Sequence, residues 1–129
     1  MRRTIHPAGI DGTVRAPASK SVMIRVTAAA LLAGEGETRI TNPSRSEDAL
    51  SGLAVARALG ASVGDQNGIV TIRGGLSPVD QNLDCGESGL CIRMFSAIAA
   101  LADTELTLTG REPLLRRPAT AMEGAAPGR

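Results

Sequence analysis

Apolar residues recur along the chain at two spacings, and the wider spacing, of three to four residues, is typical of helices. This spacing predicts helices over residues 19–33, 46–59 and 88–101. Ser19 is a good N-cap for the first helix, and Gly34 is placed to end it. A capping-box pattern, Ser44 with Glu47, precedes the second helix, whose apolar face we expect to consist of Leu50, Leu53 and Ala54.

Strict alternation of apolar and polar residues marks the strands. It predicts strands over residues 12–16, 37–41, 61–63, 69–72, 83–85 and 105–109. Gln66-Asn67-Gly68 has the composition of a tight turn, so the third and fourth of these strands should form a hairpin. The resulting order, β-α-β-α-β-β, is that of an α/β (α+β) fold, and the pattern then begins again.

The second appearance of the pattern is an internal repeat. Moving the first part of the sequence forward by 68 positions places Arg25 on Arg93 and Thr41 on Thr109. This single ungapped shift aligns helix with helix and strand with strand. We therefore predict a first unit, an incomplete second unit and a tail, over residues 13–75, 76–122 and 123–129.

Composition favours one modest globular domain, because 43% of the 129 residues are hydrophobic and 21% are charged. Phe95 is the only aromatic residue, so Ala, Val, Leu and Ile must fill the core. A net charge of +1 supplies no basic field for nucleic acid. We expect a cytoplasmic protein, because no apolar run reaches the ~18 residues of a membrane span and none follows Arg2 and Arg3 as in a signal peptide.

Cysteine and histidine usage gives no metal-binding pattern. Cys85 and Cys91 do not form a CxxC pair, and His6 is the single histidine. We therefore predict no metal site and no cofactor. Both thiols are expected to be small, partly buried groups.

A candidate anion site lies at the start of the first helix. Arg25 is the only charge between Ser21 and Gly34, in a helix that is apolar nearly all round and should be buried. Such an arginine needs a partner, which is an anionic ligand or one of the acids Glu47, Asp48 and Asp84. Lys20, Ser21 and Arg25, with the free N–H groups of a helix N-terminus, have the chemistry that a phosphate and a neighbouring carboxylate require. The alternative is a solvated Lys20 beside ordinary cap residues.

Two later positions carry related signals. Gly89 and Arg93 are separated by four residues, like Ser21 and Arg25. The missing side chain at Gly89 either lets a small ligand approach the backbone or only relieves crowding at the helix entry. Arg117 precedes Pro118, so it stands at another helix N-terminus or belongs to a solvent-facing basic pair.

These motifs together resemble the EPSP synthase (3-phosphoshikimate 1-carboxyvinyltransferase) family. The stretch Asp-Gly-Thr-Val-Arg-Ala-Pro-Ala-Ser-Lys-Ser over residues 11–21, followed by Arg25, is similar to the family's N-terminal signature. Gly-Glu-Ser-Gly over 86–89 with Arg93 resembles a second signature, and Leu108-Thr109-Gly110 with Arg117-Pro118 resembles a third. The resemblance runs in order from about residue 5 to Pro118.

The resemblance implies a fold. In the enolpyruvyl transferase fold each of two halves consists of three β-α-β-α-β-β units around a pseudo-threefold axis, an inside-out arrangement. This chain would hold about one and a half to two of these units. Residues 1–12 would form a strand segment that pairs with the absent C-terminal half.

The resemblance also implies an enzyme that transfers the carboxyvinyl group of phosphoenolpyruvate to shikimate 3-phosphate, in aromatic amino-acid biosynthesis. Lys20, Ser21 and Arg25 match residues that bind shikimate 3-phosphate. Lys20 also reaches phosphoenolpyruvate and is the matching catalytic residue. Gly89 and Arg117 match positions at the phosphoenolpyruvate site.

Three features limit what the resemblance implies. Arg93 matches only a framework arginine, and Glu87 and Leu90 depart from the usual residues beside the phosphoenolpyruvate site. The family's catalytic acids lie in sequence that this chain lacks, so we expect the chain alone to be inactive. The alternatives are a non-catalytic α/β remnant that self-associates, and a relative that transfers enolpyruvate to UDP-N-acetylglucosamine.

Overall fold

The computed structural model describes residues 2–34, 36–112 and 114. Within these residues the chain forms helices and strands in the order α1 (Lys20–Leu32), β1 (Thr38–Thr41), α2 (Glu47–Ala58), β2 (Ser62–Gln66), β3 (Ile69–Arg73), β4 (Asn82–Asp84), α3 (Gly89–Ala99) and β5 (Thr107–Thr109). The α/β class predicted from the alternating spacings is confirmed.

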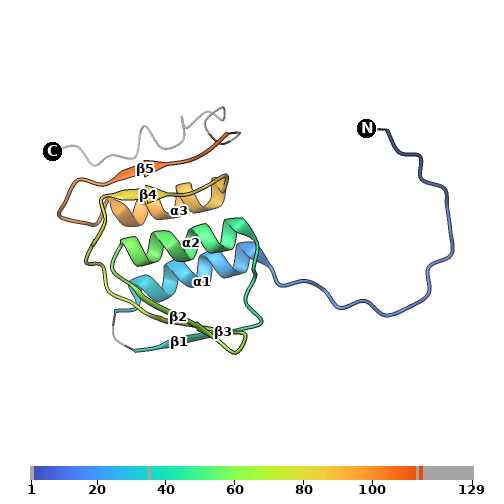
Figure 1. Ribbon diagram of the computed structural model, residues 1–129, viewed down its shortest axis with the longest axis horizontal. Helices are drawn as coiled ribbons and strands as arrows, with labels where there is room; N and C mark the ends of the chain where they lie inside the picture. The colour runs from blue at the N-terminus through green and yellow to red at the C-terminus, as the bar shows by residue number, and fades with distance from the viewer. Residues whose placement is uncertain (1, 35, 113, 115–129) are drawn as a thin grey trace.

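The helices form a layer between two small sheets (Figure 1). One sheet is antiparallel, with the strand order β1-β3-β2, and packs on α1 and α2. The other consists of β4 and β5 in parallel, with Leu83 opposite Leu108, and packs on α2 and α3. The connection from β4 to β5 therefore passes through α3, as parallel pairing requires.

The predicted hairpin is confirmed. β2 and β3 pair antiparallel, with Gln66 opposite Ile69. Asn67 and Gly68 connect them with positive φ angles of 51° and 73°. This is the geometry of a type I′ turn, which Asn-Gly favours because both residues tolerate the left-handed conformation.

Serine residues cap α1, α2 and α3, although the cap of α2 is not the serine predicted. Ser19 caps α1, as expected, and accepts a hydrogen bond from Val22 N at 3.3 Å. The capping-box prediction for Ser44 is wrong, because α2 begins at Glu47 and Ser46 directly precedes it in an extended conformation. Ser46 Oγ accepts from Ala49 N at 3.4 Å, and the hydroxyl of Ser44 lies 3.2 Å from that of Ser46. Ser44 therefore supports the cap without forming it.

The apolar face predicted for α2 is only partly correct. Leu53 is buried, but Ala54 is exposed and 45% of Leu50 is exposed. The helix instead buries small residues on two sides, because it lies between α1 and the β4–α3 layer; these are Ala49, Gly52, Val55 and Ala56. Gly52 permits a close approach, since a Cβ there would lie 3.4 Å from Ile24 Cγ1.

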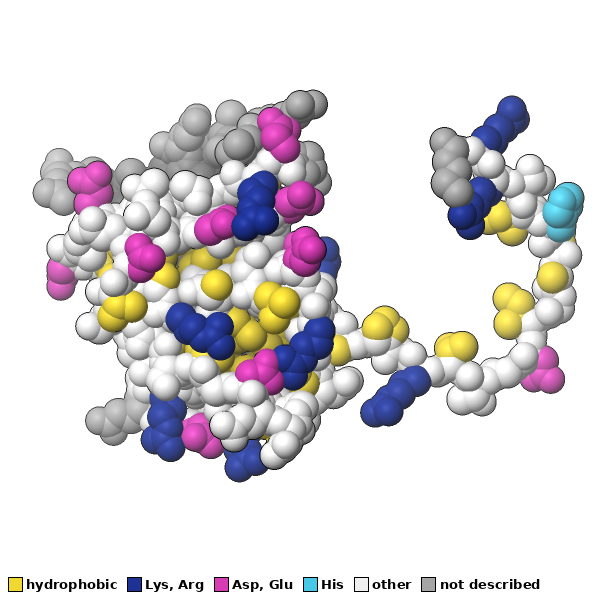
Figure 2. All heavy atoms as spheres, in the orientation of Figure 1, with side chains coloured by type: hydrophobic (Ala, Val, Ile, Leu, Met, Phe, Trp, Pro, Cys, Tyr) yellow, Lys and Arg dark blue, Asp and Glu magenta, His cyan; other side chains and the backbone are white. Residues whose placement is uncertain are grey.

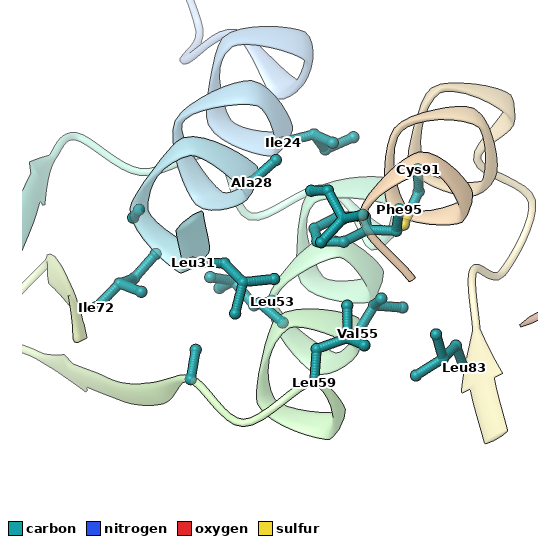
Figure 3. Close-up of a cluster of buried hydrophobic side chains, with 14 of the residues drawn as sticks. Ile24, Ala28, Leu31, Leu53, Val55, Leu59, Ile72, Leu83, Cys91 and Phe95 are labelled. Carbon is teal, nitrogen blue, oxygen red and sulfur yellow. The ribbon is translucent and has the colours of Figure 1, made fainter. Parts of the chain in front are cut away.

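The core lies between the helices and reaches both sheets (Figure 3). Phe95 is fully buried among residues of α1 and α2, with Ile72 extending the core toward the first sheet and Leu83 toward the second. As expected, most other core residues are small or aliphatic. In the described part of the chain no helix combines the length and apolar character that crossing a bilayer demands.

The repeat is visible in the structure, but the strand predicted at residues 12–16 is not formed. Adding 68 positions to α1 and β1 leads to α3 and β5, to within a residue at each end. The same shift carries residues 14–16 onto β4, yet these residues belong to an extended arm in which 92% of Val14 is exposed. The physical difference is the central residue. Leu83 holds β4 in the core, whereas the corresponding Arg15 has no apolar side chain to bury.

Candidate anion-binding site

The N-termini of α1, α2 and α3 lie at the same end of the helix layer (Figure 1). Each terminus carries unpaired N–H groups and the positive end of a helix dipole. The first turns of α1 and α3 contain no acid, whereas that of α2 contains Glu47 and Asp48. The positive dipole end of α2 is therefore neutralised by acids of the same helix. The corresponding ends of α1 and α3 have no such acids and can attract other anions.

The start of α1 brings together most of the residues predicted from the sequence. Ser19 caps the helix by binding Val22 N, so the N–H groups of Lys20 and Ser21 remain available. Lys20 stands at the first helical position, with 57% of its side chain exposed. Arg25 lies one turn further on and donates from Nη1 to the carbonyl oxygen of Ser21 at 3.2 Å. The hydrogen bond holds the guanidinium against the first turn of α1.

Lys20 is paired with an acid of the neighbouring helix. Its Nζ lies 2.8 Å from Oδ2 of Asp48, whose side chain is only 23% exposed. Asp48 is one of the acids expected as a partner of Arg25, so its pairing with Lys20 corrects that expectation. A surface pair of this kind contributes roughly 0–1 kcal/mol. The ammonium group can therefore exchange Asp48 for another anion, or bind both, at little cost.

The expectation that the helix carrying Arg25 is buried nearly all round is wrong. Arg25 is exposed, and so are Val22 and Leu32 on the same helix. Arg93, its counterpart on α3, is also exposed. Among residues 2–34, 36–112 and 114, the ion pairs involve Lys20, Arg45, Arg73 and Arg111 and leave both of these arginines without an acid.

The start of α3 has a different character. Ser88, its N-cap, is buried and accepts from Cys91 N at 3.2 Å. Gly89 opens the helix and is half-buried. Gly86, in the turn before it, has a φ of 58° and lies against Ser51 of α2. A Cβ at Gly86 would be 2.7 Å from Ser51 Oγ, so the turn is held close to α2. Arg117, the remaining predicted site residue, lies outside the described residues.

An acidic groove lies beside these termini. It encloses about 330 Å³, and its lining includes Glu47, Asp48, Asp84, Glu87 and Arg111. Figure 2 shows acidic side chains gathered around a basic one over this upper part of the molecule, with hydrophobic surface below them over the helices. The groove repels anions except near Arg111, and it meets the predicted anion site at α1 only through Asp48, the partner of Lys20.

Sequence reasoning missed the pair formed by Asp84 and Arg111. Asp84 Oδ1 accepts from Gly86 N at 2.8 Å and Oδ2 from Arg111 Nη2 at 2.9 Å. Both bonds lower the pKa of Asp84 below its ordinary value, and the bond from Gly86 N has the larger effect. The same carboxylate raises the pKa of Arg111. The sequence offered one signal. Asp84 ends β4 and Arg111 follows the end of β5 by two residues, and these two strands pair.

We expect Asp84→Asn to make the chain less sensitive to acid. A lowered pKa in the folded state stabilises the fold above the ordinary Asp pKa of about 3.9, and this contribution is lost as the pH falls through the folded-state pKa. Because half of the side chain is exposed, the contribution at neutral pH should be about 1 kcal/mol or less. Urea unfolding of both proteins at pH 7 and pH 3 measures it. Exposed Asp103→Asn is the control, and an Asp84→Asn difference that persists undiminished at pH 3 would refute the assignment.

Comparison with known proteins places this geometry in a family. A family model described as EPSP synthase (3-phosphoshikimate 1-carboxyvinyltransferase) matches residues 5–123. The chain belongs to the EPSP synthase family. This confirms the resemblance inferred from the signatures at residues 11–21 and 86–89.

Individual relatives agree with the family match. Proteins named 3-phosphoshikimate 1-carboxyvinyltransferase from Streptococcus suis and Halobacterium salinarum are each 38% identical over 92% of this chain. Each match covers 28% of the relative's own length. A solved structure, EPSP synthase from Acinetobacter baumannii, superposes with a TM-score of 0.72 at 34% identity, over 83% of this chain and 25% of that one. The fold is that of the family, and the chain spans about a quarter of these relatives.

Proposed function

We propose that this chain supplies anion-binding residues to an enzyme that transfers the carboxyvinyl group of phosphoenolpyruvate to shikimate 3-phosphate. Lys20, Ser21 and Arg25 bind the phosphate of shikimate 3-phosphate. Lys20 also contacts phosphoenolpyruvate and acts as the catalytic residue, while Gly89 and Arg117 belong to the phosphoenolpyruvate site. Family membership and the relatives' names support the reaction.

The arrangement at the start of α1 is the observation that best supports this assignment. Lys20 and Arg25 are exposed cations on consecutive turns, and Ser21 lies between them. The free N–H groups of the first turn point out of the same helix end. A phosphate placed there receives backbone hydrogen bonds and two charge-assisted ones, which are the stronger kind.

The chain alone should bind ligand weakly and catalyse nothing measurable. Transfer of the carboxyvinyl group needs acid–base groups for proton transfer in addition to cations that neutralise the phosphate and carboxylate. The chain spans about a quarter of its relatives, and of the acids that line its groove Asp48 alone pairs with a cation at the start of α1. The remaining groups would come from the part of the relatives that this chain does not cover.

Replacing Arg25 by alanine should weaken binding of shikimate 3-phosphate by at least about tenfold, since a hydrogen bond to a charged group contributes roughly 1.5–3 kcal/mol. Isothermal titration calorimetry of the intact chain measures the affinity. Arg73→Ala is the matched control, because it removes the same charge from a different part of the molecule. Arg73 ends β3, and the residues after it lie against the C-terminal end of α1, where Gly75 N donates to Leu31 O.

Two results would count against the proposal. Equal losses of affinity in the Arg25 and Arg73 variants would show that binding of shikimate 3-phosphate depends only on the net charge of the chain. If a folded chain shows no saturable binding, the result would favour the alternative drawn from the sequence, a non-catalytic α/β remnant.

We also propose that the isolated chain self-associates. Val22, Leu32 and Leu101 expose half or more of their surface on α1 and just after α3, and this exposed apolar surface favours association. Sedimentation velocity should show a weight-average mass that rises with concentration. A single monomeric species with one sharp melting transition would contradict the proposal.

A further inference from the structure

The tip of the β2–β3 hairpin places an amide side chain beside an unobstructed glycine. Asn67 and Gly68 are both exposed and connect Gln66 to Ile69. A Cβ at Gly68 would have nothing within 4 Å. Because glycine has no side chain, the side chain of Asn67 can approach the backbone nitrogen of Gly68 without a clash. Neither residue belongs to the proposed anion site, so the hairpin tip is a separate feature of the molecule.

The strand ladder leaves the N–H group of Gly68 unused. In a two-residue hairpin loop the closing hydrogen bonds are made by the flanking pair, which here is Gln66 and Ile69. Only the two loop residues, whose φ angles are 51° and 73°, have to change conformation for the amide of Asn67 to reach Gly68 N. The nitrogen is therefore available to react with the neighbouring amide carbon.

The other two asparagines of the chain show why the following residue matters. Asn42 is exposed and has the same φ of 51° as Asn67, but Pro43 follows it. Proline has no N–H, so its nitrogen cannot attack the amide. Asn82 lies in β4, and Leu83 after it is fully buried. Of the three, Asn67 is the one whose following N–H is both present and accessible.

We propose that Asn67 is a site of spontaneous deamidation, which Gly68 makes possible. A base removes the proton from Gly68 N, and the nitrogen attacks Cγ of Asn67. The N–Cγ bond forms, the Cγ–Nδ2 bond breaks, and Nδ2 leaves as ammonia with a proton from the solvent. The product is a five-membered succinimide ring. Formation of the ring transfers no electrons, so no oxidant or reductant is needed.

Hydrolysis of the ring completes the reaction. Water opens the ring at Cγ, which gives aspartate, or at the main-chain carbonyl carbon of Asn67, which gives isoaspartate. In total, one water is consumed and one ammonia is released. The formal net charge of the chain, +1 before the reaction, falls by one unit because a carboxylate replaces the neutral amide.

The two products have different consequences for the hairpin. Aspartate tolerates the left-handed conformation, so it can keep the turn. Isoaspartate carries an additional methylene in the main chain, so the loop loses the two-residue geometry that sets the register of β2 and β3. β3 is the central strand of its sheet and packs on α1. We therefore expect the isoaspartate form to melt at a lower temperature than the Asn67→Asp variant.

Incubation of the folded chain at mildly alkaline pH, followed by trypsin digestion and mass spectrometry, tests the site. Trypsin cuts after arginine, so the peptides of residues 58–73, 40–45 and 74–93 carry Asn67, Asn42 and Asn82 in turn. We expect the 58–73 peptide to gain about 1 Da and to separate into two forms, while the other two keep their masses. A sample digested without incubation gives the baseline.

Three results would overturn the proposal. The first is an unchanged mass of the 58–73 peptide. The second is a gain that occurs only when the chain is unfolded in urea, because the folded hairpin would then protect Asn67. The third is an equal gain in the peptides that carry Asn42 and Asn82, because the reaction would then not depend on the neighbouring glycine.

A pair of variants tests the ring chemistry. Glutamine has one more methylene, so its amide would have to form a less favourable six-membered ring. We expect Asn67→Gln to abolish the mass gain of the intact chain and the matched control Asn42→Gln to leave it unchanged. A full gain in Asn67→Gln would contradict the assignment. The peptide masses of the unsubstituted chain decide the main claim even if a variant does not fold, and they are independent of ligand binding at the proposed anion site.

Discussion

Phe95→Ala should destabilise the chain by about 3–5 kcal/mol, which is the usual cost of truncating a buried phenylalanine. Phe95 is the only aromatic residue and is fully buried where the helices meet. Its neighbours are small or aliphatic side chains that cannot expand to fill the space. Since a domain of this size has a total stability of roughly 5–15 kcal/mol, we expect a population of unfolded chains at room temperature.

Urea unfolding monitored by circular dichroism measures this loss. Leu101→Ala is the matched control, because Leu101 follows the same helix but is 65% exposed, and its loss should cost about 0.5 kcal/mol or less. A Phe95→Ala effect as small as that of Leu101→Ala would show that Phe95 does not organise the core.

Gly74→Ala should cost about 3 kcal/mol, for a steric reason. Gly74 follows β3 and lies against the last turn of α1. A Cβ there would overlap the carbonyl oxygen of Ala30 and lie 2.6 Å from that of Leu31. These are backbone atoms, fixed by the helix and by the bond from Gly75 N to Leu31 O at 2.9 Å, so no side chain can move aside.

The same unfolding experiment with Gly9→Ala supplies the comparison. Gly9 lies in the N-terminal arm, and a Cβ there has nothing within 4 Å. Its substitution should change the stability by about 0.5 kcal/mol or less. If Gly74→Ala proves equally harmless, then α1 and β3 are not packed as closely as described.

Local signals in the sequence predicted most of the secondary structure. The Asn67-Gly68 turn needs positive φ at both residues, so the hairpin could be foreseen from composition. The cap at Ser19 and the repeat shift of 68 positions were equally local or periodic signals. These features depend on residues close together in the sequence or on a pattern repeated along it.

The features that were missed depend on tertiary contacts. α2 buries two sides because it lies between other elements, so a single apolar face did not describe it. The segment at residues 12–16 alternates like a strand, but Arg15 occupies the position that Leu83 fills in β4. Alternation indicates that a strand is possible, whereas burial of the central residue decides whether it forms.

The candidate site, too, has features that follow from local sequence and others that depend on tertiary contacts. The positions of Lys20, Ser21 and Arg25 at the start of a helix followed from the N-cap and the four-residue spacing. The ion pairs did not, because Lys20 and Asp48 are 28 residues apart and Arg111 and Asp84 are 27 apart. Which acid meets which base is set by the packing of the elements that carry them.

The most direct test of the account is an NMR titration of the chain with shikimate 3-phosphate, because it observes the amide groups that would bind the phosphate. We predict that the amide signals of Lys20, Ser21 and Val22 shift together and reach saturation at one ligand per chain, while those near Arg73 do not move. Unchanged signals at the start of α1, or shifts confined to the groove between Asp84 and Arg111, would contradict the claim that this helix end binds a phosphorylated metabolite.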